Sequence, residues 1–200
     1  QAAFVAAMKG VMLSLNPELE FVDISHLVPP QDIFAGAFTL GQTWALFPPR
    51  TVHVAVVDPG VGTARKAIAA TAGDHYFIAP DNGILTWVMD QPDFGAYEIA
   101  ADHYFRKPIS STFHGRDVFA PVAAWLAKTY QSEVFGDQIS DYVRFTLPRA
   151  KPNGSALKGV VLRVDAFGNL MTNLTAGDLP AAMASAGKVK LKVGNTQIEK

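Results

Sequence analysis

Four polar clusters in this 200-residue sequence contain the side-chain types used in proton transfer and ligand binding. They are Asp58 with Arg65, Asp81 with Asn82, His114 with Arg116 and Asp117, and Asp165 with Asn169 and Asn173. A carboxylate can take a proton from water, an arginine can orient that carboxylate, and a histidine can relay a proton near neutral pH. Each cluster also has a purely structural explanation, so the surrounding elements must decide between the two.

The first cluster follows the most regular apolar stretch, Val52–Val57, whose β-branched residues predict a buried strand. The strand ends at Asp58, and the Pro and Gly residues of DPGVG predict a tight reversal there. Ligands of open α/β sheets bind beyond the carboxyl ends of the strands. We therefore expect Asp58 in a site, with Arg65 folding back to pair with it. The alternative is a surface turn with an incidental ion pair.

The other clusters are more ambiguous. His114 lies in the polar loop SSTFHGRD, residues 110–117, directly before a predicted helix over 118–130. Asp117 is interpreted as the cap of that helix and Arg116 as a surface partner. The Asp81-Asn82-Gly83 segment is interpreted as a turn whose side chains bond their own backbone. The segment Asp165–Asn169 has two possible interpretations. Its polar side chains could bind an ammonium group, or the segment could be a β-bulge.

The elements that position these clusters alternate in type. The spacing of apolar residues predicts a helix up to Asn16-Pro17, then a strand over Leu19–Ser25. Asp32 is predicted to cap a second helix to about Phe47, with Phe34, Phe38 and Leu46 facing inward. Strand, helix and strand in this order predict a βαβ unit and a largely parallel central sheet. Further strands are predicted over 67–71, 75–78 and 97–101, and a short helix over 84–89.

The chain is predicted to contain an α/β catalytic domain over 1–150 and a smaller all-β domain over 158–200. Lys151–Ser155, rich in Pro, Gly and Ser, is predicted to be the linker between them. Short strands are expected over 159–164, 170–174 and 188–193. Because the chain begins within a helical pattern and the β domain does not close, we expect further residues at both ends.

Composition narrows the functional classes. Hydrophobic residues make up 49% and charged residues 18%, as in globular proteins, and the net charge of −1 argues against a nucleic acid or an anionic membrane as partner. The absence of cysteine excludes disulfides and thiolate chemistry and is compatible with a cytoplasmic protein. No apolar run approaches the ~20 residues that span a bilayer. A metal site is disfavoured, because the sequence has neither a close histidine pair nor a carboxylate-rich loop.

Four segments in this order, VVDPGVGTAR, APDNG, TFHGRDVFAP and DAFGNLMTN, resemble the S-adenosylmethionine (SAM) hydrolases. These enzymes are also called SAM hydroxide adenosyltransferases and are relatives of the fluorinases and chlorinases. The resemblance implies an N-terminal α/β domain, a C-terminal β-barrel and a homotrimer with active sites between subunits. It implies hydrolysis of SAM at C5′ to adenosine and methionine, with SAM as the substrate and no cofactor.

The resemblance also implies roles for individual residues. The catalytic set falls on Asp58, Arg65 and His114. The methionine-binding pair falls on Asp165 and Asn169, and Phe113, Gly115 and Phe167 are expected near the ligand. The family carries a ribose-binding aspartate at the position of Ala2 in this chain.

Two other functions stay open at this point. A halogenase is disfavoured, because a carboxylate at Asp58 would repel a halide. A non-catalytic module that binds adenosine or SAM is the alternative from another class.

Overall fold

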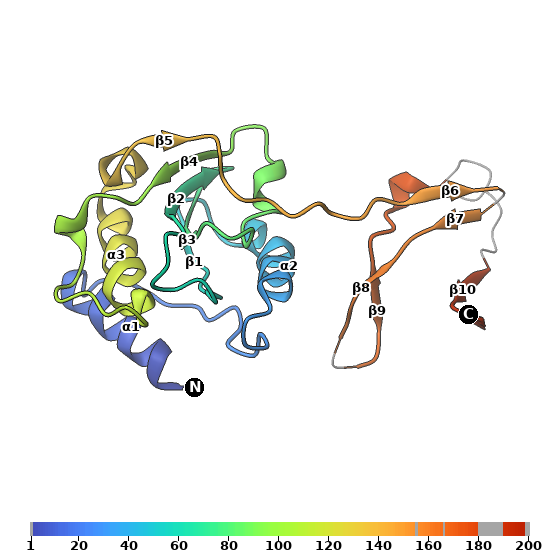
Figure 1. Cartoon of the computed structure of the whole chain (residues 1–200), viewed down its shortest axis with the longest axis horizontal. Helices are drawn as coiled ribbons and strands as arrows, with labels where there is room; N and C mark the ends of the chain where they lie inside the picture. The colour runs from blue at the N-terminus through green and yellow to red at the C-terminus, as the bar shows by residue number, and fades with distance from the viewer. Residues whose placement is uncertain (1, 155, 166, 180–189, 199–200) are drawn as a thin grey trace. The chain divides into compact units, whose positions relative to one another are not determined.

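The computed structural model describes residues 2–154, 156–165, 167–179 and 190–198, with the side chain of Ala2 also outside the description. The chain divides into two compact units, Gln1–Phe145 and Thr146–Lys200, which are described separately (Figure 1). The first unit contains Asp58, Arg65 and His114, and the second contains Asp165 and Asn169.

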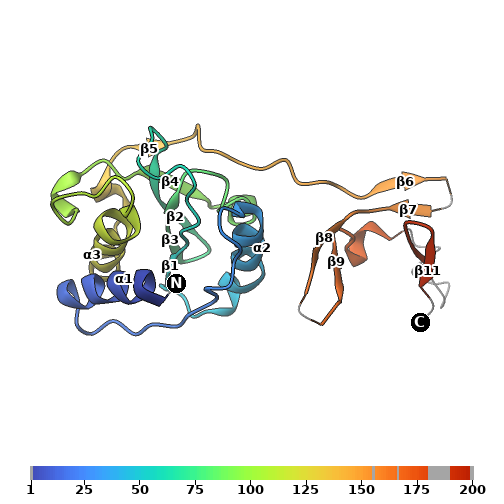
Figure 2. The ribbon, with the colours of Figure 1, turned by 60° about the horizontal axis from the view of Figure 1, so that its bottom comes forward.

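The first unit has three layers, with α1 and α3 on one face of a sheet and α2 on the other (Figures 1 and 2). Its helices are α1 (Ala2–Leu15), α2 (Ile33–Thr43) and α3 (Ala120–Thr129). Its strands are β1 (Val52–Val54), β2 (Ala67–Ala72), β3 (His75–Pro80), β4 (Gly95–Glu98) and β5 (Gln138–Ile139).

Alternate residues of β2 enter the two cores of this unit. Ala67 and Ala69 belong to the cluster that includes residues of α1 and α3. Ile68 and Ala70 belong to the cluster formed with α2. Because both faces of the strand are covered, its sequence is apolar almost throughout and does not alternate with polar residues.

The largely parallel sheet expected from the sequence is wrong for the described strands. Their order is β1-β3-β2-β4-β5, and only the β1–β3 pair is parallel. The pairs β2–β3, β2–β4 and β4–β5 are antiparallel. The reason lies in the connections: β2 and β3 are joined by the two residues Gly73 and Asp74, a length that permits only an antiparallel hairpin.

The helices follow the sequence more closely. Asp32 is the N-cap of α2 and its carboxylate accepts a hydrogen bond of 2.9 Å from the Ala35 N–H, as predicted. Phe38 is buried as expected, whereas Leu46 is 82% exposed and does not face the core. The predicted strand over Leu19–Ser25 is not formed among the described residues, because no neighbouring strand pairs with it. Leu19 and Phe21 still pack against one core and Ile24 against the other, whereas Val22 is 72% exposed.

Short helical turns connect the main elements. They are η1 (Trp44–Leu46), η2 (Val88–Asp90), η3 (Asp102–Tyr104), the π-helical turn η4 (Gly115–Phe119), η5 (Ser132–Phe135) and η6 (Ala176–Asp178). The helix predicted over 118–130 therefore begins as the π turn η4, which runs directly into α3.

The second unit consists of β-hairpins. Its strands are β6 (Lys151–Asn153), β7 (Ala156–Lys158), β8 (Val161–Val164), β9 (Leu170–Thr172), β10 (Leu191–Val193) and β11 (Thr196–Ile198). They pair as β6–β7, β8–β9 and β10–β11, all antiparallel. The segment predicted as a linker contains β6, so the sequence interpretation of Lys151–Asn153 is wrong; the Pro and Gly of this segment belong to a hairpin.

None of the helices that the structure describes is both long enough and apolar enough to cross a membrane.

Candidate active site

Asp58 stands at the end of the segment that continues β1. Ala55 N–H donates to the Ile78 carbonyl at 3.0 Å, which keeps this segment alongside β3 beyond the end of the strand. The chain then turns, with Val61 N–H bonded to the Asp58 carbonyl at 3.3 Å and Gly62 in a positive-φ conformation of 77°. This turn returns the chain toward the sheet and brings Arg65 back to Asp58, as the sequence predicted.

Asp58 and Arg65 form a multidentate ion pair that is almost removed from water. Arg65 Nε donates to both carboxylate oxygens, at 2.9 Å to Oδ1 and 3.0 Å to Oδ2, and Arg65 Nη2 also donates to Oδ2. The side chains are 5% exposed for Asp58 and 11% exposed for Arg65. A charge pair this dry and this well bonded fixes the carboxylate in one orientation. The interpretation as an incidental surface pair is therefore excluded.

His114 joins this pair through Arg65. Its Nδ1 lies 3.2 Å from Arg65 Nη2. A guanidinium group only donates hydrogen bonds, so His114 Nδ1 must accept, and the proton of the neutral ring lies on Nε2. Burial, followed by the positive charge of Arg65, lowers the pKa of His114 below its ordinary value of 6.5. The site thus holds a neutral imidazole that presents an N–H donor.

Asp117 anchors the loop that carries His114. Its carboxylate is fully buried and accepts hydrogen bonds from Arg116 Nε at 2.7 Å, Arg106 Nη1 at 3.2 Å and the Ser110 N–H at 2.9 Å. These bonds, with that of Arg116 the largest cause, lower the pKa of Asp117 to about 2. The sequence interpretation of Asp117 as a simple helix cap is wrong, because the side chain binds two arginines and the start of its own loop.

The two loops of the site touch at Gly62. A Cβ atom added there would lie 2.4 Å from the Ser111 carbonyl oxygen, so only glycine permits this approach. The contact holds the loop of Asp58 and Arg65 against the loop of His114.

Asn82 supports the site from the neighbouring strand end. Its side-chain amide donates to the carbonyl of Val57, the residue before Asp58, at 2.9 Å. Its Oδ1 accepts from the Ile84 N–H at 3.2 Å, which confirms for Asn82 the predicted side-chain bond to the turn's own backbone. For Asp81 the prediction is wrong, because its Oδ1 accepts from the distant Val143 N–H at 2.8 Å. The bond to Val57 is an additional positioning role that the sequence did not indicate.

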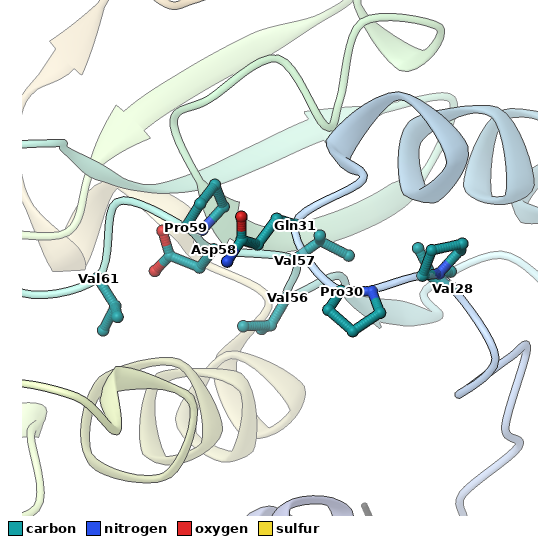
Figure 3. A pocket seen from close by; sticks show the side chains of 9 residues that line it. Val28, Pro30, Gln31, Val56, Val57, Asp58, Pro59 and Val61 are labelled. Carbon is teal, nitrogen blue, oxygen red and sulfur yellow. The ribbon is translucent and has the colours of Figure 1, made fainter.

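A pocket of about 430 Å³ opens beside Asp58 (Figure 3). Its walls come from the segments 28–31 and 56–61 and include Gln31, Val56, Val57 and Pro30. The volume lies within the usual range for small-molecule sites, roughly 300–1,000 Å³. Of the three clustered side chains, Asp58 lines this open pocket, whose volume is that of a small-molecule site.

Two further predicted ligand residues lie beside His114. The Phe113 ring packs edge-on against Phe4 at 5.0 Å between ring centroids, and the Arg116 guanidinium lies 4.6 Å from its centre. Gly115 is buried, and a Cβ atom there would meet the sulfur of Met8 at 3.1 Å. In this structure Gly115 therefore serves the packing of η4 against α1.

The predicted methionine-binding residues form one preorganised turn in the second unit. Asp165 Oδ1 accepts from the Phe167 N–H and the Asn169 N–H, each at 2.8 Å, and Asp165 Oδ2 accepts from Asn169 Nδ2 at 2.7 Å. The bond from Asn169 is the largest cause of a lowered pKa of Asp165. Phe167 is 91% exposed at the same turn. The turn thus offers an oriented carboxylate beside an aromatic ring.

The sequence did not predict that Gln31 lies in the pocket wall, nor that Asn82 and Asp117 position the loops of the site. The Pro-Pro-Gln-Asp turn is the sequence feature that could have indicated Gln31. Among the described residues, no three histidine, aspartate or glutamate side chains converge to hold a metal ion.

Comparison with known proteins shows which family the chain belongs to. Residues 1–136 match the model of the SAM hydroxide adenosyltransferase N-terminal domain. An (R)-S-adenosyl-L-methionine hydrolase of Salinispora tropica is 43% identical over 84% of this chain, and the chain spans 65% of that relative's length. A fluorinase of Actinoplanes sp. is 31% identical, covering 89% of this chain and 69% of the fluorinase.

A solved structure agrees with these sequence matches. An uncharacterized conserved protein from Thermotoga maritima superimposes with a TM-score of 0.86 at 36% identity, covering 98% of this chain and 76% of that one. The match of the family model over more than half of the chain settles the assignment: this chain belongs to the SAM hydroxide adenosyltransferase family.

Proposed function

We propose that the protein hydrolyses S-adenosyl-L-methionine at C5′, giving adenosine and L-methionine. The observation that carries the proposal is the nearly buried Asp58–Arg65 ion pair, with His114 in contact with Arg65, at the edge of a pocket of small-molecule size. Relatives named (R)-S-adenosyl-L-methionine hydrolase, 33–44% identical to this chain, support the substrate.

The reaction needs a positioned nucleophile more than it needs an acid. The sulfonium of SAM is already a good leaving group, and it departs with the C5′–S electron pair as the neutral thioether of methionine. Water is a weak nucleophile, and holding it in line ~3–3.5 Å from C5′ supplies up to ~7–11 kcal/mol of the barrier. The water oxygen forms the new bond to C5′, and its proton passes to Asp58.

The three side chains have separate tasks in this mechanism. Among the described residues, Asp58 Oδ1 accepts from Arg65 Nε alone, which leaves it capacity to accept a hydrogen bond from water. Arg65 keeps the carboxylate oriented while the proton moves. His114 donates from Nε2 to the oxygen of the water, so it positions the nucleophile and does not compete with Asp58 as a base.

The methionine end of SAM is assigned to the second unit. Asp165, oriented by Asn169, would bind the ammonium group, and Phe167 would cover the ligand. The same proposal includes a barrel-like form of the complete β domain and a homotrimer in which Asp165 of one subunit serves the Asp58 site of another. A cytoplasmic location stays a prediction of the sequence.

A halogenase is the second candidate, because fluorinases are among the relatives. Halides are anions and are bound by neutral or positively charged donors. The Asp58 carboxylate, almost inaccessible to water and next to the pocket, would repel a halide at the point of attack. Hydrolysis is therefore the function that this cluster supports best.

The experiment is incubation of the protein with SAM, followed by chromatography for adenosine and methionine in equal amounts. Parallel reactions contain chloride or fluoride. Adenosine alone supports hydrolysis, 5′-halogenated adenosine would establish a halogenase, and unchanged SAM with measurable adenosine binding would establish a non-catalytic module.

A further inference from the structure

Gln31 has an unusual backbone conformation at the pocket beside Asp58. It is the third residue of the turn Pro29–Asp32, which is closed by a 3.1 Å hydrogen bond from the Asp32 N–H to the Pro29 carbonyl. Its φ is +68°, and its side chain lines the same pocket as Asp58 (Figure 3). Pro30 before it has φ fixed at a negative value, so the turn is of type II, whose third position favours glycine.

Glutamine in this position costs conformational energy that the rest of the fold does not explain. In the part of the chain that the structure describes, three other non-glycine residues have a positive φ: Arg50, Asp74 and Tyr130. Asp74 lies in the tight hairpin loop between β2 and β3, and the Arg50 guanidinium lies over the Tyr130 ring at 5.5 Å. Within the described residues the Gln31 side chain is exposed and its amide makes no hydrogen bond.

Strained residues of this kind concentrate at ligand sites, where the side chain is kept in place at the expense of stability. The amide of Gln31 offers two donors and one acceptor to the pocket. Val56, Val57 and Pro30 line the same pocket. A ligand bound there would give the Gln31 amide the hydrogen-bond partner that it lacks among the described residues.

The position of Gln31 relative to the reaction indicates which part of the ligand it meets. If water is held at Asp58 and attacks C5′ in line, sulfur and methionine lie on the far side of C5′. The near part of the substrate is then the ribose, whose two hydroxyls both donate and accept hydrogen bonds. We propose that Gln31 recognises a ribose hydroxyl of the adenosyl group, an inference that rests on the proposed function.

The test compares binding of adenosine, 2′-deoxyadenosine and 3′-deoxyadenosine by calorimetry in the unaltered chain and in Gln31→Gly. One neutral hydrogen bond corresponds to about 2- to 12-fold in affinity. We expect the unaltered chain to prefer adenosine over one of the deoxynucleosides by this factor. In Gln31→Gly we expect the preference to disappear, while the melting temperature stays equal or rises because the backbone strain is relieved.

Asp74→Gly is the matched control, because it relieves a positive φ of 60° in the hairpin loop. It should leave the nucleoside preference unchanged. The inference is overturned if the unaltered chain fails to bind adenosine or binds both deoxynucleosides equally well, or if Gln31→Gly keeps the preference. A lack of adenosine formation from SAM by the unaltered chain would instead overturn the proposed function, and the binding ratios would still decide the role of Gln31.

Discussion

Asp58 combines a structural and a chemical role that substitution can separate. It neutralises Arg65, which is only 11% exposed, and it is proposed to receive the proton of the attacking water. Asp58→Asn keeps the size of the side chain but removes the base, so kcat should fall by ~10²–10⁴. SAM affinity, measured by calorimetry, should change little, because the carboxylate faces the water. Near-normal turnover would remove Asp58 from the mechanism.

Loss of the charge partner of Arg65 also affects folding, so the substitution needs a matched control. Breaking a buried ion pair costs roughly 3–5 kcal/mol, which thermal unfolding would reveal in Asp58→Asn. Asp141→Asn makes the same chemical change in an ion pair with Lys66, where Asp141 is 72% exposed. There thermal unfolding should change little, because an exposed ion pair is screened by water, and activity should be unchanged.

The protonation state of His114 is a second residue-scale prediction. Burial and the neighbouring Arg65 both disfavour the imidazolium, so its pKa should lie below 6.5 and the ring should be neutral at pH 7. NMR titration of the histidine rings, assigned with a His114→Gln spectrum, measures this value. A pKa above 6.5 would mean that the contact with Arg65 does not persist in solution.

At the scale of elements, the site depends on the approach of two loops at Gly62. In Gly62→Ala the new Cβ atom would collide with the Ser111 carbonyl, and φ of +77° would add strain. We expect about 1–3 kcal/mol of destabilisation and at least a tenfold loss of activity, since a misplacement of ~1 Å can cost 10²-fold. Activity at the unaltered level would show that the loop contact does not position the cluster.

Gly10→Ala is the control for this substitution. Gly10 lies in the middle of α1, and a Cβ atom there meets nothing within 4 Å. The same chemical change should therefore stabilise the protein by about 0.5–1 kcal/mol and leave turnover intact. Opposite signs for the two variants in thermal unfolding would separate the role of the loop from a general effect of alanine.

Structural features that depend on a few consecutive residues could be predicted from the sequence. The proximity of Asp58 and Arg65 followed from the Pro-Gly turn between them, and the Asp32 cap followed from its place before an apolar helix. Strand pairing was harder, because the parallel sheet was inferred from a strand over Leu19–Ser25 that has no hydrogen-bonded neighbour among the described residues. The roles of Asp117 and Gln31 depend on contacts and φ values that no local pattern specifies.

For the molecule as a whole, we expect a buried histidine pair to lower the stability at acid pH. His53 Nε2 and His75 Nδ1 are 3.2 Å apart. The His53 ring stacks on Phe77 and meets Phe47 edge-on, and the His75 ring meets Trp44 edge-on. Burial, followed by the charge of His75, lowers the pKa of His53 from 6.5 to about 4. The stabilisation is therefore fully present above pH 6.5 and is lost as the pH falls through 4.

This loss should amount to as much as about 3 kcal/mol between pH 7 and pH 4. Denaturant unfolding at a series of pH values measures it. In His53→Gln the amide keeps a hydrogen-bonding group beside His75 but does not titrate, so the slope of stability against pH should decrease in this window. An unchanged slope would assign the acid sensitivity to other groups.

The proposed trimer gives a test by complementation. Asp58→Ala and Asp165→Ala proteins should each be nearly inactive. The two variants are denatured together and refolded into mixed trimers. In some interfaces the unaltered Asp58 of one subunit would then meet the unaltered Asp165 of its neighbour, and activity should return. If mixed trimers form but remain inactive, each site lies within one chain.

The central claim is that water attacks C5′ of SAM, and an isotope experiment tests it most directly. The reaction is run in H₂¹⁸O, and mass spectrometry locates the label in the products. The account predicts one ¹⁸O atom in the 5′-hydroxyl of adenosine, none in methionine, and a rate reduced ~10²–10⁴-fold in Asp58→Asn. Adenosine without the label, or no adenosine at all, would contradict it.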